Sequence, residues 1–209
     1  MSPSLIFSPW ESDPGFLAIL EKIRGRTLVD PVRCWMLWQF AHALANTNAR
    51  YAEVGVYKGG TAYLLAMALG GSPGSRLDLF DTFWGMPPCD PTKDLHKEGN
   101  FKDVTLPEVQ AFLKFDNVAL HQGLFPDTAH ESILEGTRFR FVHVDCDIYR
   151  SVLHSCGYFF PRMESGGVIV FDDYGFPSCP GAKEAVDQFV LMTERHRIYL
   201  PTGQCFVQF

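Results

Sequence analysis

The sequence lacks several patterns that mark common protein classes. Its 209 residues include six cysteines but no C-x-x-C pair, so neither a zinc ribbon nor a thioredoxin-type redox site is indicated. The 18 lysines and arginines are scattered and the net charge is -6, which argues against a nucleic-acid-binding face. No apolar stretch approaches the ~20 residues that span a bilayer, and the first residues lack a signal-peptide pattern. We therefore expect a cytoplasmic protein with no nucleic-acid or membrane partner.

The common nucleotide motifs are also absent, and a hydrolase elbow is not indicated. The chain contains neither the G-x-G-x-x-G of dinucleotide-binding proteins nor the G-x-x-x-x-G-K-[ST] of P-loop proteins. The G-x-S-x-G at 70–74 lies between a helical pattern and a β-rich run, not in the strand-to-helix elbow of a hydrolase, and His96 has no visible partners for a catalytic triad. A dinucleotide-dependent oxidoreductase and an α/β-hydrolase are therefore disfavoured.

Strand and helix patterns alternate along most of the chain. After helical patterns at 15–24 and 30–46, short β-rich runs alternate with helical patterns; the runs lie at 51–56, 76–81, 117–123, 139–145 and 166–173. This alternation predicts an α/β fold with a largely parallel sheet covered on both faces. A tight turn at 201–203 predicts a closing antiparallel pair. The length suits one domain over 1–209, with a helical cover at 1–48 and a Rossmann-like core at 49–209.

Glycines and carboxylates follow the predicted strands. In an open parallel sheet, ligands gather beyond the carboxyl ends of the strands. The residues at these ends are Glu53 and Gly55, Asp81, Gln122 and Gly123, Asp145 and Asp147, and Asp172 and Asp173. Adjacent carboxylates in a partly dry site repel one another. The pair at 172–173 therefore indicates either a simple turn or a metal or acid/base site.

The first predicted strand leads into the spacing E-x-G-x-x-x-G-G-T at 53–61. Glycines allow a ligand close to the backbone, and the N–H groups of the following helix attract an anion. In S-adenosylmethionine that anion is the methionine carboxylate, and Glu53 would take the ammonium group. Asp81, at the end of the next strand, suits hydrogen bonding to ribose hydroxyls. A plain strand-to-helix turn is the competing interpretation.

Five segments in order resemble one enzyme family. They are "EVGVYKGGTA", "LFDTFWGMPP", "HQGLFPDT", "VDCDIYRSV" and "GGVIVFDDY", and together they resemble the macrocin O-methyltransferases of antibiotic sugars. The resemblance implies a class I methyltransferase fold with a mostly parallel seven-stranded sheet, helices on both faces and an N-terminal helical extension. It also implies S-adenosylmethionine and Mg²⁺ as cofactors, and a homo-oligomer. The apolar helix at 30–46, with Trp35, Met36 and Trp38, could supply a shared face or simply pack within one subunit.

The resemblance also implies functional residues. Metal ligands would be Asp145, Asp172 and Asp173, and the neighbouring strand ends agree with this set because a hard divalent cation would relieve their repulsion. Asp145 is the expected catalytic base. The expected cofactor-binding residues are Thr27, Leu28, Glu53, Gly55, Val56, Tyr57, Thr61, Asp81, Gln122, Gly123 and Asp145.

Three features of the sequence each have two competing interpretations. Asp147 belongs either to the same acidic edge or to a helix cap. His143 is more typical of a hydrogen-bonded core histidine than of a catalytic one. The polar connection at 81–104 is long enough for a lid over the acceptor, with Phe83, Trp84 and Phe101 either stacking on that acceptor or packing under the loop.

The function predicted from the sequence is methylation of a hydroxyl on a sugar or glycosylated small molecule. One alternative is a catechol-type O-methyltransferase, which uses a similar sheet and metal with a flat diol. The other is a protein that binds S-adenosylmethionine without turnover. The intact set of acidic residues argues against this second alternative. The identity of the acceptor depends on loops, and the sequence pattern does not predict their contacts.

Overall fold

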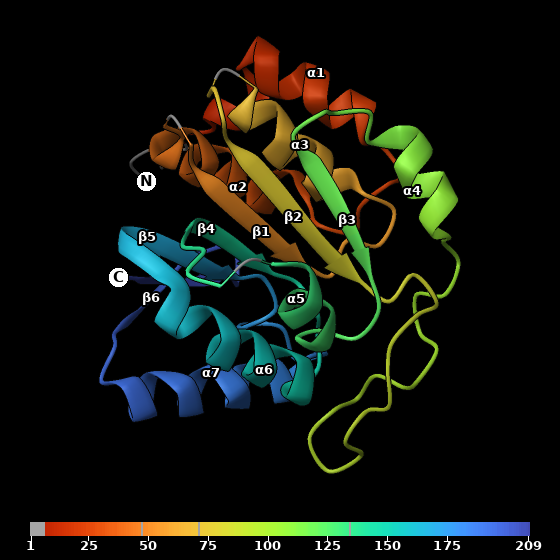
Figure 1. Ribbon diagram of the computed structural model, residues 1–209, viewed down its shortest axis with the longest axis vertical. Helices are drawn as coiled ribbons and strands as arrows, with labels where there is room; N and C mark the ends of the chain where they lie inside the picture. Colours follow the sequence, from red (N-terminus) through yellow and green to blue (C-terminus); the bar gives the residue numbers. More distant parts are fainter. Residues whose placement is uncertain (1–6, 47, 71, 134) are drawn as a thin grey trace, which may run out of the picture.

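The protein folds around one seven-stranded sheet. In the computed structural model, which describes residues 7–46, 48–70, 72–133 and 135–209, the strand order is β3-β2-β1-β4-β5-β7-β6 (Figure 1). The strands are β1 (Arg50–Val54), β2 (Arg76–Asp81), β3 (Val118–Gln122), β4 (Phe139–Val144), β5 (Met163–Phe171), β6 (Arg197–Tyr199) and β7 (Cys205–Gln208). The first five are parallel, and β7 joins β5 and β6 antiparallel. The predicted mostly parallel α/β fold is confirmed.

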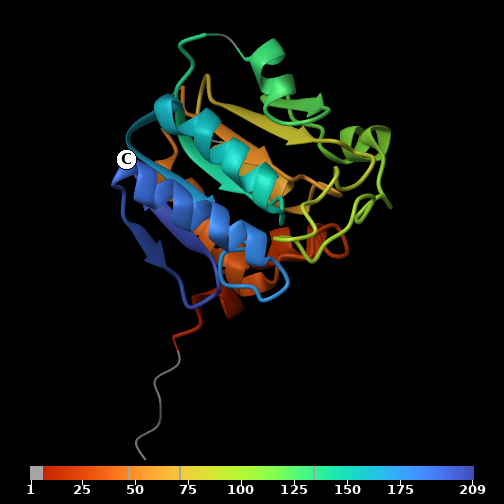
Figure 2. The same ribbon diagram turned by 90° about the horizontal axis from the view of Figure 1, so that it is seen from below.

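Helices cover both faces of the sheet. They are α1 (Pro14–Lys22), α2 (Pro31–Leu44), α3 (Gly60–Leu69), α4 (Leu106–Phe112), α5 (Asp127–Ser132), α6 (Tyr149–Phe159) and α7 (Pro180–Thr193), with 3-10 turns η1 (Pro9–Glu11) and η2 (Phe160–Arg162). Helices α1 to α4 share one hydrophobic cluster with the sheet, and α5 to α7 share the other. Figure 2 shows α6 and α7 side by side on their face, with the N-terminal helices on the opposite one.

The N-terminal helices begin where capping chemistry predicts. The Asp13 carboxylate accepts a hydrogen bond from the Phe16 amide at 2.7 Å, and Asp30 accepts from the Val32 amide at 2.9 Å. A proline follows each cap, at a position where no N–H is needed. Trp35 of α2 packs edge-on against Phe16 of α1, with ring centroids 4.9 Å apart. Much of the apolar surface of α2 is therefore used inside the chain.

None of the helices in the described ranges combines the length and the apolar composition that crossing a membrane requires.

Gly55 marks where the carboxyl ends of β1 and β4 meet. Its φ is +91°, and a Cβ atom placed on it would lie 1.7 Å from the carbonyl oxygen of Asp145. The ladder between β1 and β4 continues up to this contact, since the Asp145 amide donates to the Val54 carbonyl at 2.9 Å. Close approach of two backbones, as well as the left-handed conformation, therefore requires glycine here.

Gly55→Ala should destabilise the fold strongly. Overpacking typically costs ~1–3 kcal/mol and left-handed strain another ~1–3 kcal/mol, so we expect a loss above about 3 kcal/mol. For a chain of this size, that lowers the thermal midpoint by at least about 6 °C. Gly157→Ala is the matched control, because no other described residue lies within 4 Å of its added Cβ. In helix α6 that change should be neutral or gain up to about 1 kcal/mol. Equal midpoints for the two variants in thermal denaturation would contradict this account of Gly55.

Candidate functional site

A cavity of about 540 Å³ lies at the carboxyl ends of the parallel strands. Its size is typical of a small-molecule site. The predicted site residues that line it are Thr27, Leu28, Gly55, Val56, Tyr57, Thr61, Asp81, Gly123, Asp145 and Asp173. Three predicted residues, Glu53, Gln122 and Asp172, lie outside the lining.

Asp81 organises the turn between β1 and α3. Its carboxylate accepts hydrogen bonds from the amides of Val56 at 2.7 Å and Tyr57 at 2.9 Å, and from Phe83 at 2.8 Å. Tyr57 has a φ of +48°, a conformation that this bridging carboxylate helps to hold. Oγ1 of Thr82 also lies 3.5 Å from Oδ1, but its single proton is donated to the Gly85 carbonyl at 2.6 Å. A carboxylate has about four acceptor positions, so Asp81 keeps capacity for one further donor from the cavity. Its structural role was not anticipated from the sequence.

Gly60 allows the N-terminal segment at 26–28 to reach the cavity. A Cβ atom on Gly60 would lie 2.7 Å from Cβ of Thr27 and 2.8 Å from the carbonyl oxygen of Arg26. The Gly60 amide donates to that carbonyl at 3.1 Å, so this N–H is not available to an anion. The same contact positions Thr27 and Leu28 in the cavity wall.

Glu53 lies behind the cavity wall and not in its lining. The side chain is fully buried and is absent from the cavity lining, so the structure offers no direct contact between its carboxylate and a ligand ammonium group. Instead Oε1 lies 2.8 Å from Nδ1 of His143, and Oε2 has no hydrogen-bond partner among the described residues. Gln122 is likewise directed elsewhere, since its side chain is exposed and its amide donates to the Thr82 carbonyl at 3.3 Å.

Asp172 lies in a buried network of alternating charge. One oxygen pairs with the Arg33 guanidinium, and the other accepts from Nε2 of Gln204 at 2.7 Å and faces Nε2 of His143 at 3.4 Å. Burial would lower the pKa of His143, but its hydrogen bonds to Asp172 and Glu53 raise the pKa well above its ordinary value. Burial would raise the pKa of Asp172, yet His143 and Arg33 lower it. Two acidic side chains, Glu53 and Asp172, thus alternate with two basic ones, His143 and Arg33.

Asp145 and Asp173 have no such compensation. Both line the cavity, and neither forms an ion pair with any described residue. Burial, followed by the charge of Asp172, raises the pKa of Asp145 well above its usual range. Burial and the charges of Asp147 and Asp145 do the same for Asp173. Oxygen donors that repel one another in a partly dry site fit a divalent cation such as Mg²⁺.

The predicted three-carboxylate set is divided in this arrangement. Ligand atoms of Asp145, Asp172 and His143 lie within 4.8 Å of one another. Asp173 belongs to a different contact, in which its Oδ2 accepts from the Asp147 amide at 3.0 Å. Asp145 and Asp173 are thus the carboxylates open to a cation from the cavity. Asp172 lies outside the cavity lining, and its two oxygens already contact Arg33, Gln204 and His143.

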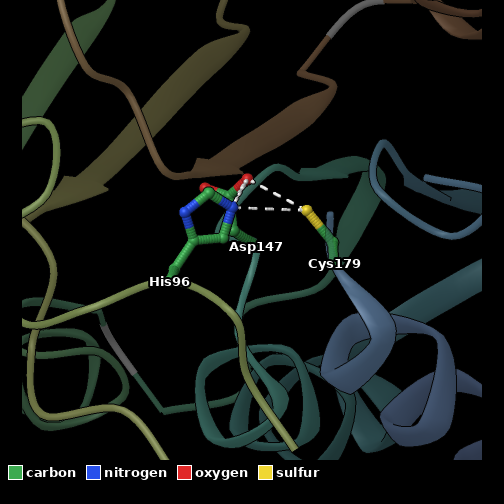
Figure 3. Close-up of side chains that lie close together, drawn as sticks. All are labelled: His96, Asp147 and Cys179. Atoms are coloured by element: carbon green, nitrogen blue, oxygen red, sulfur yellow. Dashed lines mark hydrogen bonds and ion pairs between the residues drawn. The ribbon is translucent and has the colours of Figure 1, made fainter. Parts of the chain in front are cut away.

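Asp147 does not cap α6. The Tyr149 amide at the start of α6 donates to Oδ1 of Asp94 at 2.8 Å, so a residue of the 82–105 loop provides the cap. The Asp147 carboxylate instead meets Cys179 at 3.5 Å and His96 at 3.7 Å (Figure 3). This grouping of loop, strand end and helix start was missed in the sequence. The three residues come from separate segments of the chain, so no local sequence spacing predicts that they meet.

The 82–105 loop forms one wall of the cavity and is tied to the core. Asp94 binds the start of α6, and Lys58 forms an ion pair with Asp103 at 2.5 Å. Of its three aromatic residues, Phe101 lines the cavity, Phe83 is buried in the hydrophobic core and Trp84 is 53% exposed outside the lining. Only Phe101 is therefore placed to contact a ligand in the cavity.

Comparison with known proteins gives one family. A model described as "Macrocin-O-methyltransferase (TylF)" matches residues 40–201. A Streptomyces olivaceus protein, "8-demethyl-8-(2,3-dimethoxy-alpha-L-rhamnosyl)-tetracenomycin-C 4'-O-methyltransferase", is 29% identical over 147 residues, which cover 62% of this chain and 54% of that protein. The chain spans about half the length of the curated relatives that it matches.

Solved structures show the same fold. The O-methyltransferase NovP superposes with a TM-score of 0.74 at 21% identity, covering 88% of this chain and 81% of that one. An O-methyltransferase from Bacillus cereus, solved in complex with SAH, gives 0.62 at 15% identity and covers 99% and 94%. At 21% and 15% sequence identity, these two matches show that the fold is shared and show nothing about function.

Arg33→Gln should test the charge network. Removing one partner of a buried pair typically costs ~3–5 kcal/mol, and we expect the lower end because Asp172 keeps Gln204 and His143. Arg24→Gln is the matched control, since the Arg24–Glu21 pair is 77% and 67% exposed and such pairs contribute ~0–1 kcal/mol. Urea unfolding measures both. If Arg33→Gln is as mild as Arg24→Gln, Asp172 does not depend on Arg33.

Proposed function

Since the chain belongs to the macrocin O-methyltransferase family, we propose that it transfers a methyl group from S-adenosylmethionine to a hydroxyl of a sugar or glycosylated small molecule, with Mg²⁺ bound at the acidic edge. One observation carries the proposal. The turn organised by Asp81 and the uncompensated carboxylates Asp145 and Asp173 face the same cavity of about 540 Å³. The relative from Streptomyces olivaceus is named for 4'-O-methylation of a rhamnosyl compound, which supports a glycoside acceptor.

The cofactor half of the cavity is assigned to the ends of β1 and β2. Asp81 would use its remaining acceptor position for a ribose hydroxyl. Thr61, Val56 and Tyr57 border the same region at the start of α3, with Thr27 and Leu28 closing it from the N-terminal side. Gly123 lines the wall beyond β3. The structural comparison supports this assignment through a fold that binds SAH in the Bacillus cereus protein.

The acceptor half is assigned to Asp145 and Asp173. When bound, S-adenosylmethionine supplies an electrophilic methyl group and Mg²⁺ supplies positive charge that favours proton loss from a nearby hydroxyl. Asp145 would accept that proton at a carboxylate oxygen as the acceptor oxygen attacks. Asp145 lines the cavity, so the hydroxyl of a bound acceptor could reach its carboxylate. Asp145 and Asp173 would hold the cation from the cavity, with Asp172 as the third carboxylate of the predicted set.

Phe101 and the 82–105 loop would limit access of water to this half of the cavity. Phe101 is half-buried in the cavity wall, and its ring lies 5.9 Å from that of Tyr57. An aromatic face at this position suits the apolar face of a sugar ring or an aglycone. The loop anchors at Asp94 and Asp103 keep it over the site.

The organisation and location of the protein are part of the same proposal. The N-terminal helices share a hydrophobic cluster with the sheet, which supports a single domain. All six cysteines, which lie in the described ranges, are free thiols, as suits the cytoplasm. A homo-oligomer would use the exposed edge of α2, and light scattering that detects only monomer would remove that part.

Incubation with S-adenosylmethionine and an acceptor panel tests the reaction. We expect glycosides to gain the mass of one methyl group and simple catechols to remain unchanged. Calorimetry should detect binding of S-adenosylmethionine and of its demethylated product, and no binding of NAD, because the β1 turn lacks the dinucleotide glycine pattern. Methylation of catechols alone would reassign the acceptor. Binding of NAD without any S-adenosyl ligand would overturn the methyltransferase assignment.

Asp145→Asn tests the base and the cation together. Loss of a general base typically lowers the rate ~10²–10⁴-fold, and the neutral amide also removes a charge that would hold Mg²⁺. S-adenosylmethionine should still bind, since its principal contacts are assigned to β1 and β2. Chelation should stop turnover of the unaltered protein, and Mg²⁺ should restore it. Asp116→Asn, at an exposed position, is the control and should leave the rate unchanged. Turnover that survives both the chelator and Asp145→Asn would show that the acidic edge is structural.

A further inference from the structure

Three side chains of different chemistry converge at one corner of the cavity (Figure 3). His96, Asp147 and Cys179, hereafter the His96 cluster, all line the cavity. Nε2 of His96 lies 3.6 Å from Sγ of Cys179 and 3.7 Å from Oδ1 of Asp147, and Sγ lies 3.5 Å from the same Oδ1. A nitrogen, an oxygen and a sulfur thus form a nearly equilateral triangle.

These separations match the ligand spacing of tetrahedral zinc. With Zn–S of ~2.3 Å and Zn–N and Zn–O of ~2.0–2.1 Å, tetrahedral angles set the ligand atoms about 3.3 to 3.6 Å apart. The sulfur–nitrogen and sulfur–oxygen distances of 3.6 and 3.5 Å agree with that range. The nitrogen–oxygen distance of 3.7 Å is slightly long. A small movement of one imidazole would close it.

The backbone around the His96 cluster holds the three ligands in place. Asp94, two residues before His96, is buried and caps helix α6 through the Tyr149 amide. The amide of Asp147 itself donates to Asp173, at a φ of +58° for Asp147. Cys179 is the N-cap residue of α7 and is 3% exposed. Each ligand therefore comes from a segment anchored by contacts other than those within the cluster.

We propose that the His96 cluster binds a borderline-soft divalent cation of the Zn²⁺ class. Imidazole nitrogen, carboxylate oxygen and thiolate sulfur would occupy three tetrahedral positions, and the fourth would open into the cavity for water or a ligand oxygen. On binding, the Cys179 thiol loses its proton to solvent and the sulfur becomes the metal ligand. The cation would tie the 82–105 loop to the end of β4 and the start of α7.

This site is separate from the carboxylates assigned to Mg²⁺. Asp145 and Asp173 offer only oxygen, which suits a hard cation, whereas a cysteine sulfur selects for softer metals. The proposal does not depend on methyl transfer, because metal binding is measured without cofactor or acceptor. If zinc does not bind at the His96 cluster, the proposed methyl transfer is unaffected, and the converse also holds.

Zinc and cobalt titration of the full chain, first stripped with a chelator, tests the His96 cluster. We expect one equivalent of Zn²⁺ that excess Mg²⁺ does not displace. Cobalt should give a thiolate-to-metal charge-transfer absorption, which requires a sulfur ligand. Hydrogen exchange of the 82–105 loop should slow on zinc binding. Cys179→Ser should abolish the absorption, and His96→Ala should weaken zinc binding by more than the ~10–100-fold that loss of a supporting residue costs.

Matched controls locate the metal. Cys89→Ser, in the same loop but outside the cluster, should keep the cobalt absorption. Asp145→Asn should keep zinc affinity. His96→Ala provides an independent variant if Cys179→Ser folds poorly, since His96 lies in the cavity wall and belongs to neither hydrophobic core cluster. Absence of stoichiometric zinc, retention of the absorption in Cys179→Ser, or loss of zinc in Asp145→Asn but not in His96→Ala would each overturn the proposal.

Discussion

Charge balance at the carboxyl ends of β1, β4 and β5 is the constraint on which the rest of the site depends. The parallel register pairs Glu53 with His143 and His143 with Val170, so these side chains lie side by side on the α2 face of the sheet. Asp172 follows two residues after Val170 on the same face. Burying two carboxylates here is tolerable only with cations beside them. His143 supplies one from the sheet, and Arg33 supplies the other from the first turn of α2.

This requirement explains the N-terminal extension. Asp30 caps α2 and also pairs with Arg33 through a contact of 2.7 Å between Oδ2 and Nε, so the cap and the guanidinium position one another. The helix that brings Arg33 to the sheet packs on α3 and on the central strands. Residues 26–29 follow the same path and form part of the cavity wall. Helix α2 therefore both covers the sheet and brings the positive charge that balances Asp172.

Local patterns predicted the elements better than the contacts of their side chains. The Asp30–Pro31 helix start and the strand preceding Gly55 both follow from chemistry within a few residues. The early part of β5, from Met163, was missed because Glu164 and Ser165 break the apolar run. The Asp94 cap on Tyr149 joins residues that lie 55 positions apart. Glu53 had the right residue type for a ligand contact, but the register of β4 sets His143 beside it, and the sequence pattern does not determine which face of a strand meets a ligand.

The adjacent aspartates at the end of β5 have separate surroundings for a geometric reason. Successive side chains of a strand point to opposite faces, and Asp172 is still within the ladder, since its amide donates to the Val144 carbonyl at 2.9 Å. Asp172 therefore enters the compensated network on the α2 face, whereas Asp173 turns toward the cavity and the Asp147 amide. A cation that used both carboxylates would share Asp172 with Arg33, which already supplies positive charge at Oδ2. Under the proposed function, the positive charge that Arg33 supplies at Asp172 thus opposes cation binding at that residue.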